Sequence, residues 1–156
     1  MSFAPDIVVT TEDPSRILMI VETKLTLTDL DRLEPALKKY MIGMGSPVGL
    51  IVSPEQLVLY RDRYTGRSEE SVKRIGIYPM PKTWTRFRPF DAASTESVQN
   101  RGLRFEEAVQ SWLEALPAAG VAKDFPPETK DALLEYVLPA VSEGTVRAAG
   151  PRELRA

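Results

Sequence analysis

Three charged side chains near the N-terminus have the types and spacing needed for phosphodiester cleavage. Asp6 follows a proline, and Glu22 and Lys24 stand two residues apart at the end of an apolar run. Two carboxylates provide the hard oxygen ligands that hold a divalent cation against a phosphate, and a nearby lysine can polarise the attacking water. In a strand Glu22 and Lys24 share one face, while Thr23 points to the other. Together they predict hydrolysis of a phosphodiester with Mg²⁺ or Mn²⁺ as the cofactor.

The surrounding sequence predicts a β-hairpin that would bring these groups together. Residues 6–10 are β-branched, residues 11–16 are rich in turn formers, and residues 17–23 contain the continuous apolar run of a buried strand. If Asp6 opens the first strand, antiparallel pairing places it opposite Glu22. The alternative is that the charged triplet is merely solvated where a strand leaves the core, because such triplets are common by chance.

The Pro-Asp pair followed by E-x-K resembles the PD-(D/E)XK nuclease superfamily, with its restriction-endonuclease-like fold, over roughly residues 4–62. The stretch is most similar to the N-terminal nuclease domains of type I restriction subunits. The resemblance implies an α/β domain with a mixed central β-sheet flanked by helices, acting on DNA. It also implies that Asp6, Glu22 and the backbone carbonyl of Thr23 ligate the metal, and that Lys24 orients or polarises the attacking water.

In that family a helix and another strand follow the hairpin. Apolar spacing predicts a helix over residues 28–44, with Thr28 as its N-cap. Pro35 would either kink this helix or start a second one. Residues 48–52 and 56–60 are expected to form strands joined by a Ser-Pro-Glu turn.

The sequence departs from the family pattern in two places. Members usually have a helix and a strand before the aspartate, but five residues precede Asp6 here, so these elements are missing or supplied from elsewhere. A longer gene whose start lies upstream of Met1 is another explanation. Many relatives also carry a glutamine four residues before a tyrosine of the helix, where this chain has Ala36 before Tyr40.

An amphipathic helix predicted over residues 104–116 offers a replacement for the missing first helix. Its opening residues are similar to that family helix, which often carries a glutamate into the site. Glu106 or Glu107 would then complete the metal shell in a rearranged chain order. The competing explanation is the helix dipole, which by itself favours glutamate in a first turn.

The remaining organisation is coarser. Residues 72–78 are expected to form a strand, and a further helix begins at residues 125–127 and is bent or ended by Pro139. Residues 143–156 are expected to be a flexible C-terminal tail, which leaves residues 1–142 as a single domain. The predicted apolar stripe of the last helix consists of Leu133, Leu134, Val137, Leu138 and Val141.

Composition excludes several classes of protein. The chain of 156 residues has no cysteine, which rules out zinc fingers, thiol nucleophiles and disulfides, and no histidine, which rules out a histidine base. Phosphoryl chemistry would therefore depend on carboxylates and lysine. No apolar run approaches the roughly 18 residues of a membrane span, and the N-terminus lacks the pattern of a signal peptide. We expect a cytoplasmic protein with no membrane partner.

The positive charge is concentrated in the middle of the chain. Residues 61–104 contain ten basic and five acidic residues, a charge of +5, whereas the rest contains ten basic and seventeen acidic residues, a charge of −7. Residues 82–90 interleave aromatic and basic side chains, which could stack bases and neutralise phosphates. Alternatively these aromatic rings pack on the core. The predicted DNA-binding residues are Arg61, Arg63, Lys73, Arg74, Arg86 and Arg88.

The sequence therefore predicts a metal-dependent nuclease that hydrolyses DNA. The alternative is a catalytically inactive module of the same fold, which binds nucleic acid or serves as an assembly subunit. A homodimer or a larger restriction or repair complex would be the setting of either activity.

Overall fold

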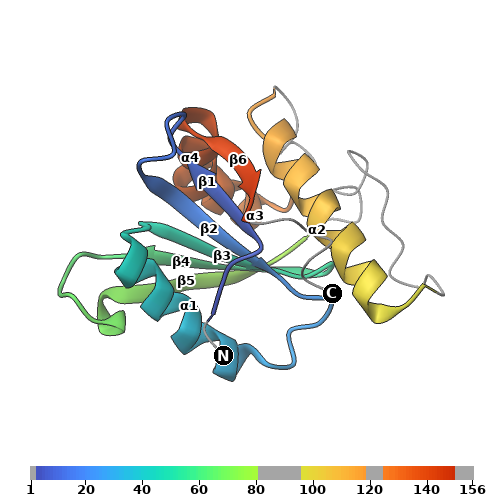
Figure 1. Ribbon diagram of the computed structural model, residues 1–156, viewed down its shortest axis with the longest axis horizontal. Coiled ribbons are helices and arrows are strands. Elements are labelled where there is room, and N and C mark those ends of the chain that lie inside the picture. Colours follow the sequence, from blue (N-terminus) through green and yellow to red (C-terminus); the bar gives the residue numbers. More distant parts are fainter. Residues whose placement is uncertain (1–2, 81–95, 119–124, 150–156) are drawn as a thin grey trace.

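The computed structural model describes residues 3–80, 96–118 and 125–149 (Figure 1). These residues form an α/β fold with a six-stranded mixed sheet of order β5-β4-β3-β2-β1-β6, flanked by helices. The predicted fold class is thus confirmed. The strands are β1 (Ile7–Thr10), β2 (Ile17–Thr23), β3 (Val48–Val52), β4 (Gln56–Asp62), β5 (Val72–Pro79) and β6 (Thr145–Ala148).

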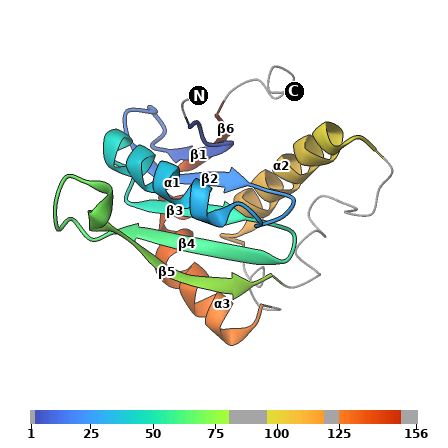
Figure 2. The same cartoon turned by 90° about the horizontal axis from the view of Figure 1, so that it is seen from below.

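Helices cover both faces of the sheet (Figure 2). One core cluster joins α1 to one face, and a larger cluster joins α2 and the C-terminal helical segments to the other. None of the helices within the described ranges is long and apolar enough to cross a bilayer. The helices are α1 (Leu30–Met44), α2 (Val98–Ala115), α3 (Pro127–Ala132), η3 (Leu133–Val137) and α4 (Leu138–Glu143), with a short 3₁₀ turn, η1 (Glu69–Ser71).

The hairpin β1–β2 forms as predicted. The two strands pair antiparallel with Ile7 opposite Val21, and the backbone N–H of Asp6 donates to the carbonyl of Val21 at 3.0 Å. The next strand, β3, runs parallel to β2, with Thr23 opposite Val52. The start of β1 and the ends of β2 and β3 therefore meet at one end of the sheet.

Helix α1 is a single helix that differs from the prediction at its start. Asp29 rather than Thr28 is the residue before the first turn, and the helix continues through Pro35 without a second start. It packs closely on the sheet, because a side chain at Gly49 would place its Cβ 2.6 Å from the sulfur of Met41. Glycine at this position lets helix and strand approach.

Helix α2 begins six residues before the predicted start. Its N-cap is Ser97, whose hydroxyl oxygen accepts a hydrogen bond from the backbone N–H of Asn100 at 3.2 Å. Phe105 and Trp112 are fully buried, and the Trp112 ring stacks on Phe125 with 5.9 Å between centroids. The apolar stripe predicted for this helix is confirmed as its core-facing side.

The C-terminal segment corrects two predictions. The helical chain passes from α3 through the π-helical η3 into α4, which contains Pro139. Leu134, which was predicted to lie on the apolar stripe, is in the π turn and is 45% exposed. The expected flexible tail is wrong over residues 145–148, which form β6. This strand pairs antiparallel with β1, and the N–H of Ala149 donates to the carbonyl of Asp6 at 3.0 Å. The C-terminal strand thus borders the predicted site.

Candidate active site

The predicted residues Asp6, Glu22 and Lys24 line one recess of about 210 Å³ at the end of the sheet. The first turns of α2 supply the opposite wall of this recess, as β2 points toward that helix (Figure 2). The juxtaposition expected from the hairpin is therefore found, with Lys24 on the same side as both carboxylates. The catalytic roles of these residues stay predictions.

Thr23 fixes the Asp6 carboxylate. Its backbone N–H and its hydroxyl both donate to the same oxygen, Oδ2 of Asp6, at 2.8 Å each. Thr23 therefore contacts Asp6 and lines the same recess as Glu22 and Lys24. These two bonds hold one oxygen of Asp6 in place.

Glu22 is buried and carries a proton near neutral pH. Glu22 is only 7% exposed, and this burial raises its pKa to about 9. The hydrogen bond to Asp6 and the negative charge of Asp6 raise the pKa further, while the positive charge of Lys24 opposes the shift. Glu22 is the proton donor in its hydrogen bond with Asp6.

Asp6 is the ionised member of this pair. Burial by itself would raise the pKa of Asp6, but hydrogen bonds from Glu22, from both donors of Thr23 and from Glu106 outweigh it and lower the pKa below the ordinary value. The recess therefore contains one carboxylate that stays charged and a neighbour that keeps its proton. Such a difference between two pKa values is typical of carboxyl groups that share one site.

Of the two glutamates of α2 that were predicted to enter the site, Glu106 reaches the recess. It is 7% exposed, makes a side-chain hydrogen bond with Asp6, and its charge helps to raise the pKa of Glu22. Glu107 is only half-buried and acts on Arg104, where its charge contributes to a raised pKa. Sequence alone could not choose between them because the choice depends on how α2 is rotated against the sheet.

The donor set suits a hard divalent cation. The three carboxyl groups are connected through Asp6, and oxygen ligands of this kind are those that Mg²⁺ and Mn²⁺ prefer. Within the described part of the chain, however, no three Asp, Glu, His or Cys side chains form a ready-made metal cluster.

The described members of the predicted DNA-binding set, Arg61, Arg63, Lys73 and Arg74, lie toward the other end of the sheet. Leu57 of β4 pairs with Val52 at the carboxylate end, whereas Arg61 pairs with Val48 and with Lys73 of β5. Arg61 is four residues beyond Leu57, or roughly 14 Å along the strand. The basic residues of β4 and β5 and the carboxylates therefore do not form one compact surface.

Several of these cations are held by the protein itself. The Nη1 of Arg61 donates to the carbonyls of Pro47 and Asp62, and its guanidinium lies 5.3 Å from the centroid of the Tyr64 ring. Arg63 and Lys73 are exposed. The DNA-binding role of this set stays a prediction. Arg86, Arg88 and the whole aromatic-basic stretch 82–90 lie outside the described residues.

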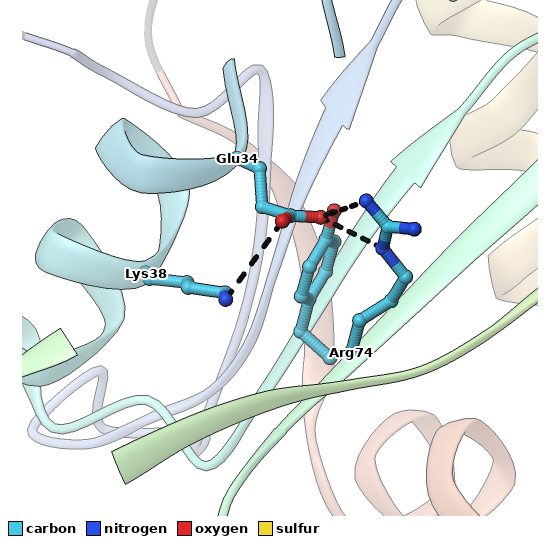
Figure 3. Close-up of polar contacts among 4 residues, drawn as sticks. Glu34, Lys38 and Arg74 are labelled. Carbon is cyan, nitrogen blue, oxygen red and sulfur yellow. Dashed lines mark hydrogen bonds and ion pairs between the residues drawn. The ribbon is translucent and has the colours of Figure 1, made fainter. Parts of the chain in front are cut away.

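Arg74 belongs to a structural cluster that ties α1 to the sheet (Figure 3). Its Nη2 lies 2.7 Å from Oε2 of Glu34, and the hydroxyl of the buried Tyr60 donates to the same oxygen at 2.5 Å. Lys38 adds a weaker contact to Glu34 at 3.8 Å. Burial is the largest single effect and raises the pKa of Glu34, but the hydrogen bonds from Tyr60 and Arg74 and the charges of Arg74 and Lys38 together lower it. Arg74 therefore holds α1 against the sheet.

Tyr60→Phe should lower the free energy of unfolding by roughly 1.5 to 3 kcal/mol, because it removes a hydrogen bond to a charged acceptor. Urea denaturation at neutral pH measures this loss. The control is Lys73→Ala on β5, an exposed position where we expect a change within about 0.5 kcal/mol. Equal stability of Tyr60→Phe and the wild type would show that the cluster does not stabilise the fold.

Comparisons with protein-family models, with curated proteins and with solved structures each found no match.

Proposed function

We propose that this protein is a metal-dependent deoxyribonuclease whose active centre is the recess around Asp6. The observation that carries the proposal is the convergence of Asp6, Glu22, Lys24 and Glu106, which are distant in the sequence, in one recess. Carboxylates with unequal proton affinity beside a lysine are the groups that phosphodiester hydrolysis requires in a protein without histidine.

Each residue has a distinct role in this proposal. Asp6 and Glu22 would hold Mg²⁺ or Mn²⁺ with the backbone carbonyl of Thr23, and the bound cation would supply charge stabilisation at the phosphate. Thr23 also keeps Asp6 oriented through its two hydrogen bonds. Lys24 is exposed and close enough to attract Glu22, so it can reach a water beside the phosphate.

The arrangement of elements supports a nuclease-like core in a rearranged chain order. The helix and the strand that the resemblance expects before the aspartate both have counterparts late in the chain. Helix α2 delivers Glu106 to the recess, and β6 pairs with the strand that Asp6 precedes. A restriction-endonuclease-like fold is part of the proposal for this reason, as is DNA as the partner.

A second candidate is a nuclease-fold module that binds nucleic acid without cutting it. The separation of the basic residues on β4 and β5 from the carboxylates favours this alternative, because binding there does not require the recess. Assembly into a homodimer or a larger restriction or repair complex is compatible with both candidates. A cytoplasmic location accompanies the proposal.

The decisive experiment is a cleavage assay on plasmid and single-stranded DNA with Mg²⁺, with Mn²⁺ and with a chelator. We expect cleavage that requires either ion and stops in the chelator. DNA binding without cleavage in any condition would favour the inactive module, and neither binding nor cleavage would favour an assembly role.

A further inference from the structure

We propose that the recess accepts an unpaired DNA strand, which passes between the end of β2 and the first turns of α2, and excludes an intact duplex. This inference rests on the proposed nuclease function and specifies its substrate. Four properties of the recess support it: the burial of its carboxyl groups, the chemistry of its helical wall, the charge of its described lining and the space beside Gly102.

The carboxyl groups are too buried for a rigid duplex to reach. Glu22 and Glu106 are each 7% exposed, and the recess that contains them measures about 210 Å³. Duplex DNA is stiff, with a persistence length of about 50 nm, and bending it sharply costs several kcal/mol. An unpaired strand turns freely about its backbone torsions and can place one phosphodiester at the bottom of the recess.

The helical wall offers uncharged side chains that suit bases and sugars. Val98, Gln99 and Leu103 of α2 line the recess without any charge, and Val98 is 66% exposed. Phosphate contacts dominate the binding of duplex DNA, whereas unpaired bases offer apolar faces to nearby side chains. An exposed valine at the mouth of the recess therefore fits an unpaired nucleotide.

The described lining of the recess contains little of the positive charge that would attract a duplex. Among the described residues that line it, Lys24 is the cation, and it faces three carboxyl groups. The basic residues of β4 and β5 lie at the opposite end of the sheet, beginning with Arg61. The affinity of the recess for DNA must therefore come from contacts between its lining and the unpaired strand, in addition to contacts with the metal.

Gly102 leaves space where the strand would pass. It lies inside α2, where alanine would be more stable by about 1 kcal/mol. A Cβ at this position would meet nothing within 4 Å, so neither packing nor backbone conformation demands glycine there. Gly102 faces the recess, and the room it leaves is available to a substrate.

The test compares Gly102→Leu with the matched control Gly43→Leu. Gly43 also lies inside a helix, α1, and a Cβ there also meets nothing within 4 Å, but it does not line the recess. Both variants should fold, since leucine favours helix over glycine, and thermal melts verify this. The substrates are one labelled oligonucleotide, unpaired and annealed to its complement, assayed with Mn²⁺. Fluorescence anisotropy without metal measures binding of the same oligonucleotide.

We expect the wild type to cleave the unpaired strand about tenfold faster than the duplex, a difference of about 1.4 kcal/mol in the barrier. Gly102→Leu should lower both cleavage and binding of the unpaired strand about tenfold, while Gly43→Leu behaves as wild type. Cleavage of the duplex as fast as of the unpaired strand would overturn this inference and leave the proposed nuclease function intact. If neither substrate is cleaved, the nuclease proposal fails, and the binding measurements then test the path of the unpaired strand. Weaker binding of the unpaired oligonucleotide by Gly102→Leu alone supports this path. Equal binding by the wild type and both variants overturns it.

Discussion

Replacing Asp6 or Glu22 by alanine should reduce DNA cleavage by about a thousandfold or more, because a lost metal ligand removes several kcal/mol of transition-state stabilisation. The isosteric changes Asp6→Asn and Glu22→Gln should have the same effect without leaving a cavity. DNA binding should persist or become stronger, since a negative charge near the phosphate is removed. Initial cleavage rates with Mg²⁺ and Mn²⁺, together with anisotropy and thermal melts, measure the three quantities separately.

Adjacent glutamates on α2 provide the matched control. Glu106→Gln should lower the cleavage rate about 10- to 100-fold, the usual effect of losing a group that orients metal ligands. Glu107→Gln should stay within about twofold, since its charge acts on Arg104 outside the recess. Lys24→Ala should lower turnover more than metal affinity. Undiminished activity of Glu22→Gln would instead reveal a contaminating nuclease.

The hairpin and its charged end could be predicted because local signals specify them. A β-branched run, a cluster of turn formers and an apolar run fix two antiparallel strands, and their register then places Asp6 next to Glu22. The helix after the hairpin and the strands around residues 50 and 58 were predictable for the same reason. Each of these signals lies within a few residues of the element it specifies.

The missed features depend on contacts between distant parts of the chain. The short strand β6 has no distinctive pattern, and it forms because β1 offers a free edge. The contact of Glu106 with Asp6 depends on the rotation of α2, and the pairing of Arg74 with Glu34 joins residues forty positions apart. The two bonds from Thr23 to Asp6 likewise join residues seventeen positions apart.

The protonated state of Glu22 makes stability depend on pH in the metal-free protein. Glutamate in the unfolded chain ionises near 4.5, whereas burial holds the pKa of Glu22 at about 9 in the fold. The stabilising contribution of the proton is therefore complete below about pH 4.5 and is lost as the pH rises toward 9, by at most about 1.4 kcal/mol per pH unit. The pKa of Asp6 is lowered in the fold, so its contribution to stability is lost as the pH falls below the ordinary aspartate pKa, outside this window. Glu22→Gln cannot ionise, so its stability relative to the wild type should increase with pH, as urea denaturation at several pH values would show.

Binding of Mg²⁺ or Mn²⁺ should release about one proton near neutral pH, because the cation requires Glu22 in its charged form. Metal affinity should then rise as much as about tenfold per pH unit up to pH 9, a hundredfold change over two units. Isothermal titration calorimetry in two buffers of different ionisation enthalpy measures both the affinity and the number of protons released. Glu22→Gln should lose the proton release together with most of the affinity, whereas Glu107→Gln should keep both. Affinity independent of pH, with no proton released, would mean that Glu22 is not a metal ligand.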